Sequence, residues 1–251
     1  MQTGNFIEGK NSAFSNDGSY FLYTSTNNTV VIVDSETRQK RCTLIGHTVG
    51  IGWVITSPDA KVIVTSGYDK TIRIWNPTNG KELQRCTLIG HTEEISWSIT
   101  SPDDSILVTT AYDRTVRIWN ATNGEELHRC TLTGHTGRVV WTIMSPDDSI
   151  IATSASDRTV RIWNSTNGEE LQRCTLIGHT DNIKWAIMSP DDSIIATTAF
   201  DKTVRMWNST NGEELRVSRS YYWVRPPVIT PDENLLINAD FDGRVRIWKL
   251  E

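Results

Sequence analysis

The sequence lacks several features that would assign it to a common functional class. No run of eighteen apolar residues occurs, so no transmembrane helix is expected. Residues 1–10 hold no basic segment followed by an apolar one, so no signal peptide is expected. Acidic residues outnumber basic ones, 30 to 25, whereas a nucleic-acid binder usually carries a basic excess. We therefore expect contact with neither membranes nor nucleic acids.

Cysteine is scarce, and its spacing argues against disulfides. The four cysteines follow one another at intervals of 44 residues, at Cys42, Cys86, Cys130 and Cys174. Equivalent positions on neighbouring repeats should lie beyond the roughly 7 Å between Cα atoms that a disulfide tolerates. We expect reduced, packed thiols, and hence a cytoplasmic or nuclear location. No Cys/His cluster has the spacing of a metal site, so neither a metal nor a cofactor is expected.

An internal repeat of 44 residues runs through the chain. Gly-His recurs at 46–47, 90–91, 134–135 and 178–179, and residues 120–163 differ from 164–207 at only 12 of 44 positions. A degenerate copy stands on each side of these full copies. Residues 1–251 are therefore interpreted as one domain of six repeats. The repeats end near Val33, Trp75, Trp119, Trp163, Trp207 and Trp248.

Each repeat has the pattern of four short strands. In one copy, the segments 183–188, 193–200, 203–208 and 214–217 are rich in apolar and β-branched residues and are separated by turn sequences. Asn-Gly pairs, which favour tight hairpin turns with positive φ, occur at 79–80, 123–124, 167–168 and 211–212. A thin sheet cannot bury both faces alone, and radial stacking solves this problem. The sequence predicts an all-β fold, a six-bladed β-propeller of four-stranded antiparallel blades.

These residues resemble the WD-repeat β-propeller family, and the resemblance covers nearly the whole chain. In that family, a His bonds a Ser or Thr and an Asp, and this group supports the Trp. Here the hydroxyl would come from Thr65 or Ser66 and their equivalents. A satisfied buried network of this kind rigidifies a blade, so its members are interpreted as structural rather than catalytic. The resemblance assigns to this network His47, Asp69, Trp75, His91, Asp113, Trp119, His135, Asp157, Trp163, His179, Asp201 and Trp207.

The sequence departs from the family pattern in three places. Trp-Asn replaces Trp-Asp, which should matter little because any small polar turn residue fits there. The sixth repeat lacks Gly-His, and the shorter segment 218–228 predicts a remodelled loop. On the innermost strand Ile51, Trp53 and Ile55 alternate, which predicts a regular strand where the family usually has a bulge. The tryptophans of this strand are expected to wedge between blades, and the alternative is an aromatic-lined channel: Trp53, Trp97, Trp141 and Trp185.

Closure of the ring is left open by the sequence. By alignment Met1 corresponds to Thr43, and only residues 249–251 follow Trp248, so the last blade is short of an outer strand. Face packing alone could close the ring, the chain could be cut from a longer protein, or a partner strand could complete the blade. An open edge invites pairing, so self-association through the last blade is one expectation.

Differences between the full repeats concentrate at a few loop positions. In the family these positions ring the top of the central channel and contact partners. Four aromatic side chains among them are typical of a protein-binding hot spot. The alternative is free variation of exposed loop residues. The predicted partner-binding positions, here called the top rim, are Tyr68, Tyr112, Ser156, Phe200, Phe241, Gly50, Glu94, Arg138, Asn182, Gly52, Ser96, Val140 and Lys184.

The favoured function is a non-catalytic scaffold or adaptor that binds a partner protein or peptide on the top rim. A sensor fragment of a larger protein, similar to the repeat tails of immune-type receptors, is the alternative. A propeller hydrolase or lyase is a remote one, because every His except His128 falls at the structural position and no glycine-rich phosphate loop occurs. Basic residues beside the rim raise a further hypothesis of an acidic or phosphorylated peptide: Lys70, Arg114, Arg158, Lys202 and Arg244.

Overall fold

The computed structural model describes residues 11–121, 125–171, 175–220, 226–230, 232, 234–239, 241 and 243–249. For residues 84–89 and 128–131 it describes the backbone alone. No helix in these ranges has the length and apolar character needed to cross a membrane.

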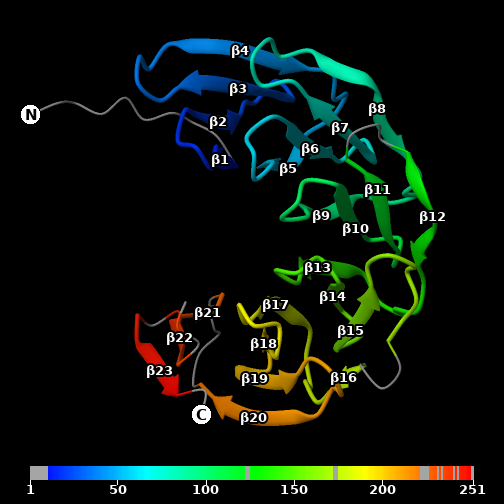
Figure 1. The fold of residues 1–251 in the computed structure, drawn as a ribbon, viewed down its shortest axis with the longest axis vertical. Coiled ribbons are helices and arrows are strands. Elements are labelled where there is room, and N and C mark those ends of the chain that lie inside the picture. Colours follow the sequence, from blue (N-terminus) through cyan, green and yellow to red (C-terminus); the bar gives the residue numbers. More distant parts are fainter. Residues whose placement is uncertain are drawn as a thin grey trace, which may run out of the picture.

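Six antiparallel sheets, numbered sheet 1 to sheet 6 along the chain, make up the described residues, with four strands in each of the first five and three in the sixth (Figure 1). Sheets 1 and 2 contain β1 (Ser12–Phe14), β2 (Tyr20–Thr24), β3 (Thr29–Asp34), β4 (Lys40–Ile45), β5 (Ile51–Thr56), β6 (Ile63–Gly67), β7 (Thr71–Trp75) and β8 (Glu82–Ile89). Sheets 3 and 4 contain β9 (Ile95–Thr100), β10 (Ile106–Ala111), β11 (Val116–Asn120), β12 (Glu126–Leu132), β13 (Val139–Met144), β14 (Ile150–Ala155), β15 (Thr159–Asn164) and β16 (Leu176–Ile177). Sheets 5 and 6 contain β17 (Ile183–Met188), β18 (Ile194–Ala199), β19 (Thr203–Asn208), β20 (Glu214–Arg219), β21 (Val228–Ile229), β22 (Leu235–Ala239) and β23 (Val245–Lys249).

The prediction of six antiparallel sheets is confirmed, and the strands of each sheet pair in chain order. In sheets 1 to 5 the outer strand lies after the residue at which the repeat was taken to end, as β8 follows Trp75 and pairs with β7. The tight turns before the outer strands contain Gly80, Gly168 and Gly212, with φ of +69°, +70° and +72°. Only glycine adopts this conformation without strain, which explains the repeated Asn-Gly pair. The equivalent pair at 123–124 lies outside the described residues.

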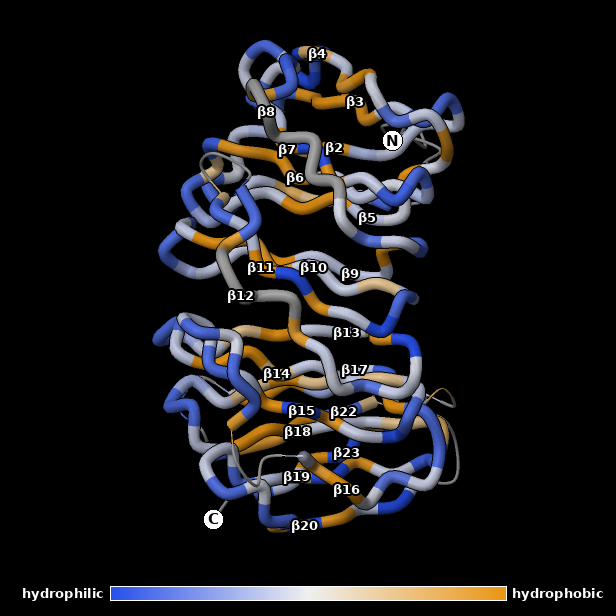
Figure 2. The backbone as a smooth tube through the Cα atoms, turned by 90° about the vertical axis from the view of Figure 1, so that its right-hand side faces the viewer, coloured by the Kyte–Doolittle hydropathy of each residue, from blue (hydrophilic) through white to orange (hydrophobic). Residues whose placement is uncertain are grey.

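The core consists of apolar layers between consecutive sheets. Val64, Ile72 and Ile74 on one face of sheet 2 pack against Leu107 and Trp119 of sheet 3. Burying one such aliphatic side chain contributes about 1.5–3 kcal/mol. Figure 2 shows hydrophobic residues along the strands and hydrophilic ones at many of the turns at their ends. Every interior sheet is therefore stabilised by its two neighbours.

The prediction of a regular inner strand, based on Ile51, Trp53 and Ile55, is wrong, because a bulge interrupts β5. Ile51 pairs with Gly67 and Trp53 with Ser66, which leaves Gly52 as an extra residue. The same shift in β9, β13 and β17 leaves out Ser96, Val140 and Lys184. The bulge moves the buried positions to Ile51 and Val54. The sequence hid this change of phase because Ile51, Trp53 and Ile55 are all apolar.

The six sheets follow an arc, and this arc is open between sheet 1 and sheet 6 (Figure 1). The prediction of a short last blade is confirmed, since sheet 6 has three strands. Its face toward the opening is bare, with Val245 63% and Ile247 60% exposed. The remodelled loop predicted at 218–228 lies partly outside the described residues, at 221–225. The curvature depends on how neighbouring sheets pack, which the strand pattern of one repeat does not encode.

Cys42 is a free, half-buried thiol. Burial raises the pKa of its thiol, which lowers its reactivity. The side chains of the other three cysteines lie outside the described residues.

Candidate functional site

A hydrogen-bonded network fixes each full repeat from inside. His47 Nδ1 lies 3.0 and 2.9 Å from the two carboxylate oxygens of Asp69, and His47 Nε2 lies 2.8 Å from Thr65 Oγ1. Trp75 Nε1 donates to the same hydroxyl at 2.8 Å. Thr65, rather than Ser66, therefore provides the hydroxyl. The same contacts recur in sheets 3, 4 and 5 through Thr109, Thr153 and Thr197.

Protonation in this network follows from burial and hydrogen bonding. Burial lowers the pKa of His47 and favours the neutral imidazole. Burial also pushes the pKa of Asp69 upward, but hydrogen bonds from Thr71, Thr48 and His47 hold it below its usual value. A neutral imidazole protonated on Nδ1 can donate to the carboxylate and accept at Nε2. The ring nitrogens of His47 and the indole nitrogen of Trp75 thus have partners inside the sheet, which leaves them no role toward a substrate.

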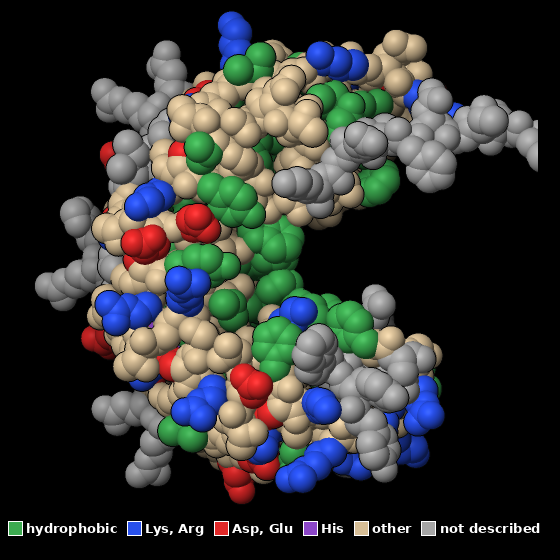
Figure 3. Space-filling view, turned by 180° about the vertical axis from the view of Figure 1, so that it is seen from behind, with side chains coloured by type: hydrophobic (Ala, Val, Ile, Leu, Met, Phe, Trp, Pro, Cys, Tyr) green, Lys and Arg blue, Asp and Glu red, His purple; other side chains and the backbone are tan. Residues whose placement is uncertain are grey.

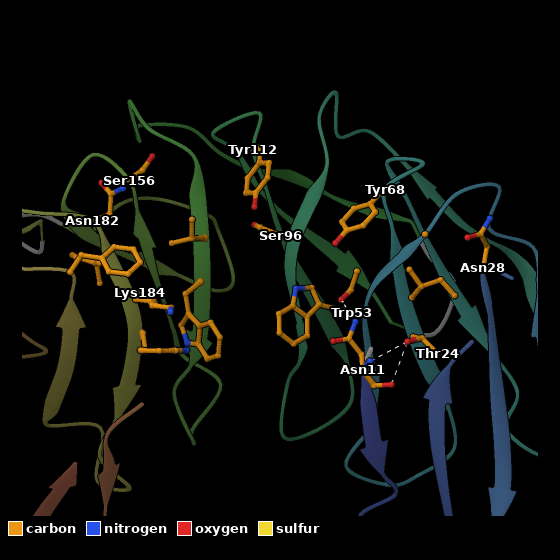
Figure 4. A pocket seen from close by; sticks show the side chains of 18 of the residues that line it. Asn11, Thr24, Asn28, Trp53, Tyr68, Ser96, Tyr112, Ser156, Asn182 and Lys184 are labelled. Carbon is orange, nitrogen blue, oxygen red and sulfur yellow. Dashed lines mark hydrogen bonds between the residues drawn. The ribbon is translucent and has the colours of Figure 1, made fainter. Parts of the chain in front are cut away.

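A cavity of about 1180 Å³ is lined by residues of the inner strands and of the loops next to them (Figure 4). This volume is slightly above the roughly 300–1,000 Å³ of typical small-molecule sites, so it has room for several side chains of a peptide. The residues that line it are Asn11, Thr24, Ser25, Thr26, Asn28, Gly50, Ile51, Gly52, Trp53, Tyr68, Ser96, Tyr112, Val140, Trp141, Ser156, Asn182, Ile183, Lys184, Trp185 and Phe200.

The structure brings most of the predicted top rim together around this cavity. Ten of its thirteen residues line the wall: Gly50, Gly52, Tyr68, Ser96, Tyr112, Val140, Ser156, Asn182, Lys184 and Phe200. The other three lie beside it. The main-chain oxygen of Glu94 accepts from the amide of Tyr112, and the Arg138 guanidinium lies 4.8 Å from the Tyr112 ring centroid. Phe241 is 51% exposed on the neighbouring loop of sheet 6.

Sequence reasoning missed the contribution of sheet 1, because the first repeat has no Gly-His to mark it. Five polar residues of that sheet line the cavity: Asn11, Thr24, Ser25, Thr26 and Asn28. Asn11 Nδ2 donates to the main-chain oxygen of Gly52 at 2.6 Å, which joins sheet 1 to sheet 2. The sequence did contain evidence for this contribution: alignment of residues 27–33 with 69–75 places Thr26 at the position equivalent to Tyr68.

The inner-strand tryptophans both bridge sheets and line the cavity. The ring centroids of Trp53 and Trp97 are 4.1 Å apart, and those of Trp97 and Trp141 are 3.8 Å apart. Trp141 Nε1 donates to the main-chain oxygen of Ala186 at 3.1 Å, across the boundary to sheet 5. Trp53, Trp141 and Trp185 also belong to the cavity wall. Figure 3 shows hydrophobic side chains along the concave side of the arc.

The basic residues beside the rim do not reach the cavity. Lys70, Arg114, Arg158 and Lys202 occupy turns with φ between +65° and +70° and are not part of the wall. Lys70 Nζ donates to the main-chain oxygen of Thr92 at 2.6 Å. Within the described residues no group of three or more His, Cys, Asp or Glu side chains could hold a metal ion. The side chain of His128 is not described.

Comparisons with known proteins agree with this architecture. The family described as "WD domain, G-beta repeat" matches residues 38–76, 82–120, 127–164 and 171–208, which is more than half of the chain. No curated protein matches the sequence. The crystal structure of the computationally designed Ika8 protein is similar in fold, with a TM-score of 0.82 and 24% identity over 95% of this chain and 70% of that one. Because the family model matches four repeats over more than half of its length, the chain belongs to the WD-repeat family.

Proposed function

We propose that this chain is a non-catalytic scaffold that binds a partner protein or peptide on the top rim, in the cytoplasm or the nucleus. One observation carries the proposal: the positions that differ between the repeats surround one cavity. Tyr68 in sheet 2, Tyr112 in sheet 3 and Phe200 in sheet 5 line it together. Aromatic side chains around a concave centre are typical of binding hot spots.

The WD-repeat fold supports an interaction scaffold in general, and two features of this chain favour it over an enzyme. His47 is engaged with both Asp69 and Thr65, and the His and Asp equivalents in sheets 3 to 5 are paired in the same way. A catalytic base would need a free lone pair toward a substrate. Among the described residues of the cavity wall, Lys184 is the one charged side chain. The described wall therefore lacks the paired acid and base that hydrolysis or elimination requires.

A comparative capture experiment tests the rim. The wild type and a Tyr68→Ala, Tyr112→Ala, Phe200→Ala variant are used as baits, and captured proteins are quantified by mass spectrometry. A matched control removes three exposed apolar side chains outside the cavity, in Ile177→Ala, Leu215→Ala, Val217→Ala. The rim variant should lose partners that the control retains, with unchanged circular dichroism. Equal capture by all three baits would remove the top rim as the binding surface.

A second proposal concerns the bare end of the arc. Val245 and Ile247 of sheet 6 are exposed, and β23 has no outer neighbour in the described residues. At the other end Phe14 is 69% exposed on sheet 1. Inside the arc, the face of each sheet equivalent to that of Val245 packs on the following sheet. The exposed face of sheet 6 in one copy can therefore pack on the exposed face of sheet 1 in another copy. Light scattering should give a mass that rises with concentration, and Val245→Asp should abolish this rise. A constant monomer mass would contradict self-association.

A further inference from the structure

Lys184 is the one charged side chain in the described wall of the cavity. The other wall residues are aromatic, aliphatic, glycine or neutral polar residues. Acidic residues exist nearby in the sequence, at Glu93, Glu94 and Asp181, but they are not part of the wall. A single positive charge in an otherwise uncharged cavity selects for a ligand with one negative charge.

The Lys184 ammonium is held by aromatic rings rather than by a carboxylate. Its Nζ lies 4.4 Å from the ring centroid of Trp185, 5.2 Å from that of Phe200 and 5.9 Å from that of Phe241. Within the described residues it forms no salt bridge. By contrast, the Arg161 guanidinium is paired with Glu170 at 2.6 Å. Cation–π contacts stabilise the charge but use none of its hydrogen-bond donors, so the ammonium can still bind an anion.

The backbone explains why this side chain alone reaches the cavity with a charge. Lys184 is the extra residue of the bulge in β17, and its equivalents in the three preceding full repeats are Gly52, Ser96 and Val140. All four line the cavity. Ser96 uses its hydroxyl to donate to the main-chain oxygen of Val139 at 2.6 Å. The four bulges thus bring four residues to one space, and of these only Lys184 carries a charge.

The part of the wall away from Lys184 suits an apolar group. Figure 4 shows Lys184 on one side of the cavity, and Trp53, Tyr68 and Asn11 on the other. Tyr68 is 51% exposed, so its ring presents a free surface. It stands beside the backbone of Gly50 and Gly52, where an added Cβ would lie 3.2 Å from its ring carbons. An aromatic side chain of a ligand can stack on this neutral surface while an anionic group remains near Lys184.

We propose that the cavity binds a peptide segment in which one carboxylate adjoins an aromatic side chain. The carboxylate pairs with the Lys184 ammonium, and the aromatic ring packs on Trp53 and Tyr68. This inference rests on the proposed function, since it names the partner chemistry of the same rim. An Asp or Glu side chain and a free C-terminus supply the same carboxylate, and the experiment distinguishes them.

The test uses isothermal titration calorimetry at low salt with three synthetic probes. Acetyl-Gly-Phe-Asp-Phe-amide carries a side-chain carboxylate, and acetyl-Gly-Phe-Asn-Phe-amide is its neutral isostere. Acetyl-Gly-Phe-Asn-Phe with a free C-terminus carries only the terminal carboxylate. At least one acidic probe should bind about tenfold more tightly than the neutral one, because an ion-paired hydrogen bond is lost in the isostere. The tighter acidic probe identifies the source of the carboxylate.

Variants at position 184 separate charge from packing. Lys184→Met should bind all three probes equally, and Lys184→Arg should retain the preference for the acidic probe. Lys202→Met removes an equal charge outside the cavity and should leave the preference intact. Equal affinities for the wild type, or no binding of any probe, would overturn the inference. The capture experiment with the Tyr68, Tyr112, Phe200 variant judges the proposed function separately, since it needs no assumption about charge.

Discussion

Sheets 5 and 6 carry nearly the same strand but expose it differently. The segment 203–207 reads TVRMW and 244–248 reads RVRIW. Val204 and Met206 are 3% and 4% exposed, whereas their equivalents Val245 and Ile247 are 63% and 60% exposed. The first pair is covered by sheet 6 and the second pair faces the opening of the arc (Figure 1). In this repeat protein, the repeat determines the strand and the neighbouring repeat determines its burial.

The largest expected effect comes from a charge placed at the two matched valines. Val204→Asp should destabilise the fold by about 4 kcal/mol or more, because an unpaired carboxylate would be buried. Val245→Asp should change stability by less than about 0.5 kcal/mol in dilute solution, where the chain is a monomer, since its side chain is exposed in a single copy. Urea unfolding of each purified variant measures the difference in the free energy of unfolding. A similar large loss in both would mean that the end face is covered in solution.

A second difference between the two sheets is the buried network, which sheet 5 has and sheet 6 lacks in this form. Thr197 Oγ1 serves both Trp207 Nε1 and His179 Nε2, at 2.8 Å each. Thr197→Val should cost about 2–3 kcal/mol, because two buried polar atoms lose their partner. The adjacent Thr198 is also fully buried, but its hydroxyl has no partner, so Thr198→Val should be neutral or stabilising. Thermal unfolding of the pair gives the comparison, and equal losses would refute a special role for the network.

Acid should weaken sheet 2 through His47, for which sheet 6 has no equivalent, since the sequence has no histidine after His179. Burial lowers the pKa of His47 in the folded state, so the unfolded chain binds the proton more readily. The stability from His47 is therefore complete above the unfolded pKa of about 6.5 and is lost as the pH falls toward the folded pKa. Urea midpoints between pH 7.5 and 5.5 should fall in the wild type and fall less in His47→Gln. An equal fall of the urea midpoint with pH in the wild type and in His47→Gln would contradict a role of His47 in the pH dependence.

The smallest expected effect concerns the turn before the third strand. Lys202 in sheet 5 has φ of +65°, whereas sheet 6 has Gly243 there, with φ of +85°. A left-handed conformation costs a non-glycine residue about 1–2 kcal/mol, and glycine avoids this cost. Glycine in turn lowers stability by about 0.5–1 kcal/mol, because it makes the unfolded chain more flexible. Lys202→Gly should therefore stabilise the protein by about 0.5 kcal/mol. Differential scanning calorimetry measures the shift, and a lower melting temperature would show that the Lys202 side chain makes a stabilising contact.

The local features of the fold were predictable because they repeat. Alternating apolar residues, Asn-Gly pairs and the Gly-His to Trp spacing fixed the number of sheets and the strand order. The variable loop positions identified half of the cavity wall, including Lys184 and Tyr68. These predictions succeeded because strand pairing and hairpin turns depend on residues close in the chain.

Other features depend on contacts between repeats and could not be obtained in this way. The bulge at Gly52 was hidden because apolar residues stand on both sides of it. The open arc depends on the packing angle between sheets, to which each interface adds a small rotation. The part of the cavity formed by Asn11 and Thr24 depends on how sheet 1 meets sheet 2, since Asn11 donates across that boundary.

The neighbouring indoles of Trp53, Trp97 and Trp141, one edge-to-face pair and one stacked pair, give this protein an internal spectroscopic probe of its shape. Each belongs to a different sheet, and their ring centroids lie 4.1 and 3.8 Å apart. Transition dipoles at such separations couple strongly, and this coupling depends on distance and mutual orientation. Near-ultraviolet circular dichroism should therefore contain an exciton couplet that changes whenever the angle between sheets changes. Any narrowing or widening of the arc when a partner binds becomes visible without a label.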